Sequence, residues 1–84
     1  MHESGIIQQL VEELERLAKE NDARRVVAVE LVTGDPELAA EQHLREHFEV
    51  ASRGTVAEGA KLWVRLDSSS PRPGLILQSV ELER

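Results

Sequence analysis

The spacing of apolar residues predicts a helix at the start of the chain. From Ile6 to Ala18, apolar side chains recur every three or four positions, with Gln, Glu, Arg and Lys between them. Ser4 is suited to the N-cap position and Asn21-Asp22 to a stop, so we expect the helix over roughly residues 5–20. The amino group of the chain would then lie within a few residues of the first turn.

The middle of the chain predicts a buried strand and a second helix. Arg24 to Val32 is β-branched and too short and apolar for an amphipathic helix, which favours a largely buried central strand. Asp35 supplies an N-cap acceptor, and Pro36 follows at the first helical position, so a helix begins there. It is expected to stop near Gly54, a residue able to adopt the left-handed cap conformation. Its apolar stripe would consist of Leu38, Ala40, Leu44, Phe48 and Ala51.

Two segments near the end alternate apolar and polar residues, which is typical of half-exposed strands. They cover residues 62–66 and 76–82. The link 67–74, "DSSSPRPG", is rich in turn-forming residues and most simply makes an antiparallel hairpin. We therefore expect one α+β domain over residues 1–84, of order α-β-α-β-β. Two helices would pack on one face of a three-stranded mixed sheet.

Composition narrows the function classes. The 84-residue chain has a formal net charge of −6, with acidic residues spread along it, which argues against nucleic acid as a partner. No apolar run approaches the ~20 residues that a membrane span needs, and the N-terminus lacks the features of a signal peptide, so we expect a cytoplasmic protein without a membrane partner. The absence of cysteine excludes disulfides, thiolate metal sites and cysteine nucleophiles.

Three local strings resemble one protein family. "MHESGI" at the start, "GTVAEGAKL" after the second helix and "SVELE" at the end resemble the HypA/HybF nickel metallochaperones of hydrogenase maturation. The resemblance covers about residues 1–66 and 75–84. Family members carry a zinc domain with two Cys-x-x-Cys pairs before the last strand. Here residues 67–74 replace it, so the sequence resembles the nickel domain alone and no zinc is expected.

The first three residues have the chemistry of a nickel site. The amine of Met1, the amide nitrogen of His2 and its imidazole Nδ1 can close a five-membered and a six-membered chelate ring on one metal. Three nitrogens in a plane suit Ni(II) or Cu(II) better than tetrahedral Zn(II). The resemblance implies that Met1, His2 and Glu3 are the metal ligands. A simpler interpretation of Glu3 is that its negative charge is favourable at a helix N-terminus. The two roles are compatible.

Other candidate ligands are weaker. Some family members place a further carboxylate at the position of Ala40, and Asp35, Glu37 or Glu41 could substitute for it. His43 and His47 stand four apart on one helix face, a spacing that can hold a metal. We favour a solvated His43 and a partly buried His47 that packs beside the apolar stripe, with zinc on this pair as a less favoured alternative.

The remaining expectations concern partners. Trp63 should point away from the side of the sheet that Leu62 and Val64 occupy, and it marks a contact surface if it is exposed. The resemblance implies a non-enzymatic nickel carrier for [NiFe] hydrogenase that works with a maturation GTPase and a nickel-enzyme precursor. The alternative is a metal-independent module that docks that GTPase or client. Exposed sheet edges leave a homodimer open.

Overall fold

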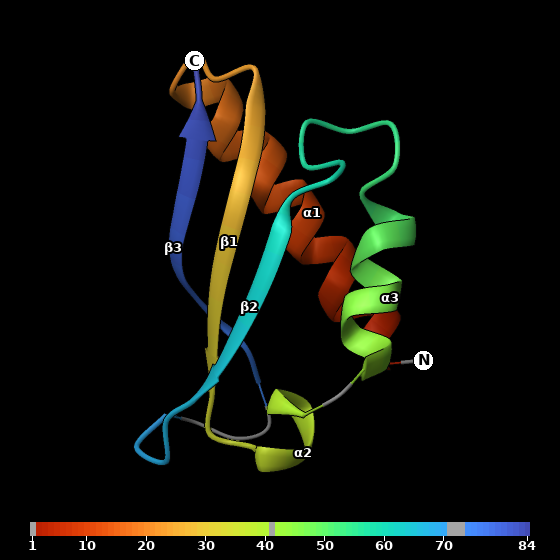
Figure 1. Ribbon diagram of the computed structural model, residues 1–84, viewed down its shortest axis with the longest axis vertical. Coiled ribbons are helices and arrows are strands. Elements are labelled where there is room, and N and C mark those ends of the chain that lie inside the picture. The colour runs from red at the N-terminus through yellow and green to blue at the C-terminus, as the bar shows by residue number, and fades with distance from the viewer. Residues whose placement is uncertain (1, 41, 71–73) are drawn as a thin grey trace.

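The computed structural model describes residues 2–40, 42–70 and 74–84, with side chains from residue 5 onward. The elements in chain order are α1 (His2–Glu20), β1 (Arg25–Thr33), α2 (Pro36–Ala39), α3 (Gln42–Ala51), β2 (Lys61–Leu66) and β3 (Ile76–Glu83). The three strands form one sheet, and α1 crosses behind it while α3 lies beside β2 (Figure 1). The predicted α+β class is confirmed, with one more helix than expected.

Strand β1 is the centre of the sheet. It pairs in parallel with β2 and antiparallel with β3, in the order β2-β1-β3. The prediction of a mixed sheet with a central first strand is therefore confirmed, but the β2–β3 hairpin is wrong. A central β1 separates the two strands by two interstrand spacings, about 10 Å, so the link between them must cross the end of the sheet.

The described part of that link is anchored to the sheet. The backbone N–H of Asp67 donates to the carbonyl of Thr33 at 2.8 Å, which extends the β1–β2 contact by one residue. The hydroxyl and backbone N–H of Ser69 donate to Asp67 Oδ1 at 2.7 and 3.0 Å, and these bonds lower the pKa of the Asp67 carboxyl. The segment thus begins with a hydrogen-bonded turn on its way to β3.

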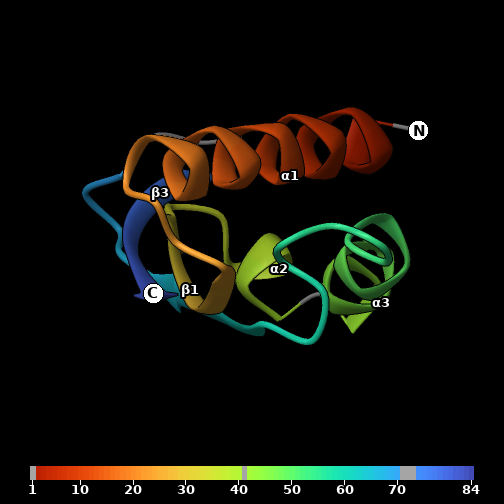
Figure 2. The ribbon, with the colours of Figure 1, turned by 90° about the horizontal axis from the view of Figure 1, so that it is seen from above.

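The core lies between the sheet and the two longer helices. Seen from above, α1 runs across the sheet while α3 lies to the side of the strands and beneath the start of α1 (Figure 2). Among the described residues, the buried core consists of Ile7, Leu10, Val11, Leu14, Ala18, Val26, Val29, Leu31, Leu44, Phe48, Ala57 and Leu62. Apart from one phenylalanine these are aliphatic, as the composition predicts.

The second predicted helix is broken into α2 and α3. Asp35 caps α2 by accepting from the N–H of Glu37 at 2.9 Å, and Pro36 begins it, as predicted. Ala40, however, is the exposed C-cap of α2 and no part of an apolar stripe. Residues Leu38 and Leu44 are six apart and would lie on different faces of a continuous helix. The break lets α3 bury Leu44 and Phe48 independently.

The first helix begins earlier than its sequence predicts. It starts at His2 and includes Ser4, so Ser4 is not the N-cap. Packing of Ile7, which is 1% exposed, holds this end of the helix, and such tertiary burial outweighs a local capping preference. The other end is as predicted: α1 stops at Glu20, and Asp22 takes the left-handed conformation with φ 54°.

The loop that contains the family string "GTVAEGA" has a structural role. The Thr55 hydroxyl donates to the carbonyl of Ser52 at 2.7 Å and accepts from the N–H of Ala57 at 3.1 Å. The carbonyl of Val56 accepts from the N–H of Val26 at 2.8 Å, next to the start of β1. Gly54 has φ 79°, which agrees with its predicted left-handed conformation after the helix. The string therefore fixes the path from α3 to β2.

The contact between α1 and the rest of the core is testable at Leu14. This side chain is fully buried. We expect Leu14→Ala to lower the free energy of unfolding by about 2–5 kcal/mol, because it removes apolar contacts and leaves a cavity. Urea unfolding followed by circular dichroism measures the change. The neighbouring exposed Glu15→Ala should stay within about 0.5 kcal/mol of wild type; equal effects of both would contradict this core.

Candidate metal centre

The structure places two of the three predicted metal ligands, His2 and Glu3, at the start of α1. His2 and Glu3 are the first two residues of the helix, while Met1 and the side chains of residues 2–4 lie outside the described part. The first four N–H groups of a helix have no acceptor within it. The amide nitrogens of His2 and Glu3 are therefore among the groups that the helix itself leaves unused.

Packing of α1 on α3 fixes where this end lies. Ile7 belongs to the same buried cluster as Leu44 and Phe48 of α3. The amino-terminal end of α1 lies near the beginning of α3 in Figure 1, and in Figure 2 its first turn lies directly above α3. The start of α1 therefore lies beside α3 and away from the turn that ends α1.

The two histidines of α3 lie where the sequence predicts. His43 is exposed and His47 half-buried. Their ring centroids are 6.4 Å apart, and His43 Nδ1 lies 3.2 Å from a carboxylate oxygen of Glu46. No three potential ligands among the described side chains, which begin at Gly5, form a group able to hold a metal. Zinc on this helix alone therefore has no third ligand from the described residues.

The carboxylates that could replace the family's further ligand are only partly accounted for. Asp35 uses Oδ1 to cap α2, and Glu37 is exposed in the first turn of that helix. Glu41 lies outside the described residues. Neither Asp35 nor Glu37 is part of a group of three potential ligands among the described residues. The structure therefore assigns to neither of them the role of the carboxylate ligand that some family members have at the position of Ala40.

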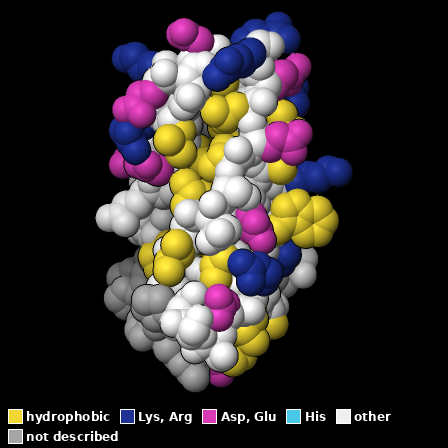
Figure 3. All heavy atoms as spheres, turned by 90° about the vertical axis from the view of Figure 1, so that its left-hand side faces the viewer, with side chains coloured by type: hydrophobic (Ala, Val, Ile, Leu, Met, Phe, Trp, Pro, Cys, Tyr) yellow, Lys and Arg dark blue, Asp and Glu magenta, His cyan; other side chains and the backbone are white. Residues whose placement is uncertain are grey.

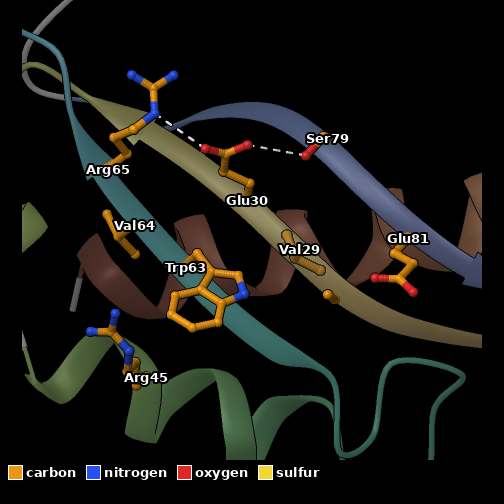
Figure 4. Close-up of a pocket in the computed structure, with 9 residues that line it drawn as sticks. Val29, Glu30, Arg45, Trp63, Val64, Arg65, Ser79 and Glu81 are labelled. Atoms are coloured by element: carbon orange, nitrogen blue, oxygen red, sulfur yellow. Dashed lines mark hydrogen bonds and ion pairs between the residues drawn. The ribbon is translucent and has the colours of Figure 1, made fainter.

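A second feature, which sequence reasoning missed, lies on the uncovered face of the sheet. The carboxylate of Glu30 on β1 accepts from Arg65 on β2 at 3.1 Å and from the hydroxyl of Ser79 on β3 at 3.2 Å (Figure 4). The three residues tie all the strands together. They are far apart in sequence, and only the register that pairs Glu30 with Trp63 and Ser79 brings them to one place.

Trp63 stands beside this group and is 59% exposed, so the condition under which the sequence marks it as a contact surface is met. It lines a hollow of about 510 Å³ together with Arg45 of α3 and the residues around Glu30 (Figure 4). On the β3 side of the molecule, further apolar side chains are visible at the surface (Figure 3), where Leu17, Leu77, Val80 and Leu82 line a shallow groove between α1 and β3. Both hollows leave apolar side chains at the surface.

The sequence of this domain is similar to those of known proteins. The family model "Hydrogenase/urease nickel incorporation, metallochaperone, hypA" matches residues 1–70. The hydrogenase maturation factor HypA of Archaeoglobus fulgidus is 35% identical over 72 residues, which are 86% of this chain and 66% of that protein. The hydrogenase maturation factor HybF of Escherichia coli K12 is 39% identical over 64 residues, 76% of this chain and 57% of that protein.

The chain belongs to the HypA family of nickel incorporation metallochaperones. The resemblance seen in the sequence is thus confirmed, and so is the prediction of a non-enzymatic protein, since the family consists of chaperones. The chain spans less than two thirds of the length of these relatives. The described helices include none that is long and apolar enough to cross a membrane.

The exposure of Trp63 is testable because it is the only tryptophan of the chain. We predict that its emission in the native protein is that of an indole in water and that acrylamide quenches it nearly as well as in the urea-unfolded protein. No described helix covers this face of the sheet, and more than half of the Trp63 surface is exposed. Blue-shifted, protected emission would show that this face is covered in solution.

Proposed function

We propose that residues 1–84 act as a single nickel-binding domain that carries Ni(II) to a nickel enzyme under maturation, above all [NiFe] hydrogenase. Membership of the HypA family supports this, and two relatives are themselves named hydrogenase maturation factors. The observation that carries the proposal is the start of α1 at His2, which leaves the first amides of the chain without helical acceptors.

The proposed site uses Met1, His2 and Glu3. The amine, the His2 amide nitrogen and imidazole Nδ1 hold the metal in one plane, and Glu3 contributes its backbone nitrogen or carboxylate. Planar nitrogen coordination suits Ni(II) and Cu(II), whereas Zn(II) prefers a tetrahedron and thiolates. The positive end of the α1 dipole does not favour a cation, so coordination bonds and loss of the amide proton must supply the binding energy.

The proposed partners are a maturation GTPase and a precursor of the nickel enzyme, and the proposed location is the cytoplasm. The surface that favours partner contact is the sheet face with Trp63, because no helix of the described structure covers it. The same surface supports the second candidate function, a docking module that does not handle metal. Both candidates use the Trp63 face, and only the first requires the terminus.

Nickel titration of the untagged protein distinguishes them. We expect the wild-type chain to bind one Ni(II), and both His2→Ala and a chain extended by a few residues at the N-terminus to lose that binding, since each removes chelating nitrogens. Isothermal titration calorimetry measures this. Gln8→Ala, an exposed change on the same helix, is the control. Equal binding by all variants would remove the terminal site, and no binding by wild type would leave the docking function.

The pH dependence tests the amide ligand. The metal displaces protons from the amine, the imidazole and the amide, so acid competes with nickel and binding weakens as pH falls. Well below pH 6.5, where the imidazole and the amine are both protonated in the free protein, binding releases three protons, and we predict that affinity falls by about a thousandfold per pH unit. Titrations between pH 5 and 8 measure the slope. A limiting slope of two protons or fewer at the acid end would contradict coordination by the amide, because the amine and the imidazole alone account for two.

A further inference from the structure

Strand β3 has a free outer edge. It pairs with β1 on one side, and no other strand of the described structure lies on its other side. Figure 1 shows β3 at the border of the sheet, whereas β2, the other outer strand, has α3 beside it. The outer strand of a sheet presents a row of backbone N–H and C=O groups that can pair with another chain. The edge of β3 can therefore accept a further strand.

An apolar groove follows this edge. It lies between α1 and β3, and Leu17, Leu77, Val80 and Leu82 are its apolar lining. The three β3 side chains pack against the core on their inner side and are half-buried, since no described residue encloses them fully. Figure 3, which faces this border of the sheet, shows apolar side chains at the surface. A chain added along β3 removes more of this apolar surface from water, which favours association.

We propose that the occupant of this edge is a second copy of the same chain, which adds its own β3 in antiparallel orientation across a two-fold axis. The two three-stranded sheets then form one sheet of six strands. A contact of this kind uses the same surface on both subunits, so each copy supplies the free strand that the other needs. The inference is independent of the proposed nickel site, because it uses none of the proposed ligands.

The register of β3 on β1 indicates how the two copies align. Val80 is opposite the buried Val29, so its side chain lies on the helix side of the sheet. Ser79 is opposite Glu30, so it lies on the open side, as does Glu81 two residues further on. A pair centred on Val80 places the two Val80 side chains opposite each other and Ser79 opposite Glu81 of the second copy. This alignment matches the two sides of the sheet and opposes no acidic pair, whereas centring on Glu81 would oppose two carboxylates.

The shape of the molecule permits this contact. The turn after α1 is bound to the end of β3, where the N–H of Arg24 donates to the carbonyl of Glu83 at 2.7 Å. Because the second β3 runs in the opposite direction, the two α1 ends lie at opposite ends of the strand pair. The side of the molecule that carries β3 measures 34 by 17 Å between Cα atoms (Figure 3). A side of this size offers at most roughly the 800 Å² per partner of a standard interface, so we expect a weak dimer.

Sedimentation velocity of the untagged, metal-free chain tests the proposal. We expect a monomer–dimer equilibrium with a Kd between about 10 µM and 1 mM. Val80→Lys opposes two ammonium groups at the axis, so we expect it to raise the Kd at least about fivefold. Val50→Lys, the same change at an exposed position of α3, is the matched control and should dimerise as wild type does. Urea unfolding checks that both variants are folded. A wild-type chain that is monomeric up to about 1 mM would overturn the inference, as would a folded Val80→Lys variant with an unchanged Kd.

Cross-linking gives a readout that does not require a charge in the half-buried position of Val80. The chain has no cysteine, and Val80→Cys replaces one small apolar side chain with another. Residues directly opposite in an antiparallel pair have Cα atoms about 4.5–5.5 Å apart, a separation that a disulfide spans. We expect oxidation to convert Val80→Cys to a covalent dimer much faster than Val50→Cys at the same concentration. Equal rates would overturn the inference.

The emission of Trp63 distinguishes this contact from one on the open face of the sheet. Trp63 lies on β2, and the proposed interface is formed by β3, on the other side of β1. We therefore expect acrylamide to quench Trp63 equally well in the monomer and in the cross-linked Val80→Cys dimer. Protection of Trp63 in that dimer would overturn the proposed arrangement. All these measurements use metal-free protein, so their outcome and that of the nickel titration are separate.

Discussion

Burial of the apolar side of α1 is the interaction on which the rest of the structure depends. Leu14 is enclosed by the sheet and helices, and Ile7, near the start of the helix, is enclosed with Leu44 and Phe48 of α3. In so small a domain, with a core that is almost entirely aliphatic, few other contacts can hold the elements together. The same contact that stabilises the fold thereby fixes the position of the start of α1, so the stability of the domain and the placement of His2 and Glu3 have a common origin.

The sheet shows how far local patterns predict this fold. Val26, Val29 and Leu31 of β1 are buried, and a strand this apolar must lie between neighbours, which its sequence correctly predicts. The hairpin predicted from "DSSSPRPG" is incompatible with that central position. With β1 in the middle, β2 and β3 each pair with β1 and do not pair with each other. A composition rich in turn-forming residues indicates only that a segment bends. Whether the two strands that it connects pair with each other depends on β1, a strand far away in sequence that must be buried between them.

The site could be predicted only in part for similar reasons. Met1, His2 and Glu3 are consecutive, so their chelating nitrogens are evident from the sequence, whereas the start of α1 depends on the tertiary packing of Ile7. The break between α2 and α3 was not evident from the spacing of apolar residues in that segment. The Glu30, Arg65 and Ser79 group likewise required the strand register. Each feature that the sequence did not predict depends on contacts between residues that are far apart in the sequence.

The proposed ligands alone do not explain how such a domain would select nickel over other metals. A planar set of nitrogens disfavours zinc, but copper binds such a set more tightly than nickel. Selection of nickel must therefore come from metal supply and from a partner that delivers or accepts it. These 84 residues contain no cysteine and therefore cannot form a thiolate zinc site. The exposed sheet face with Trp63 and Arg45 is the surface that we propose for the partner, because no described helix covers it.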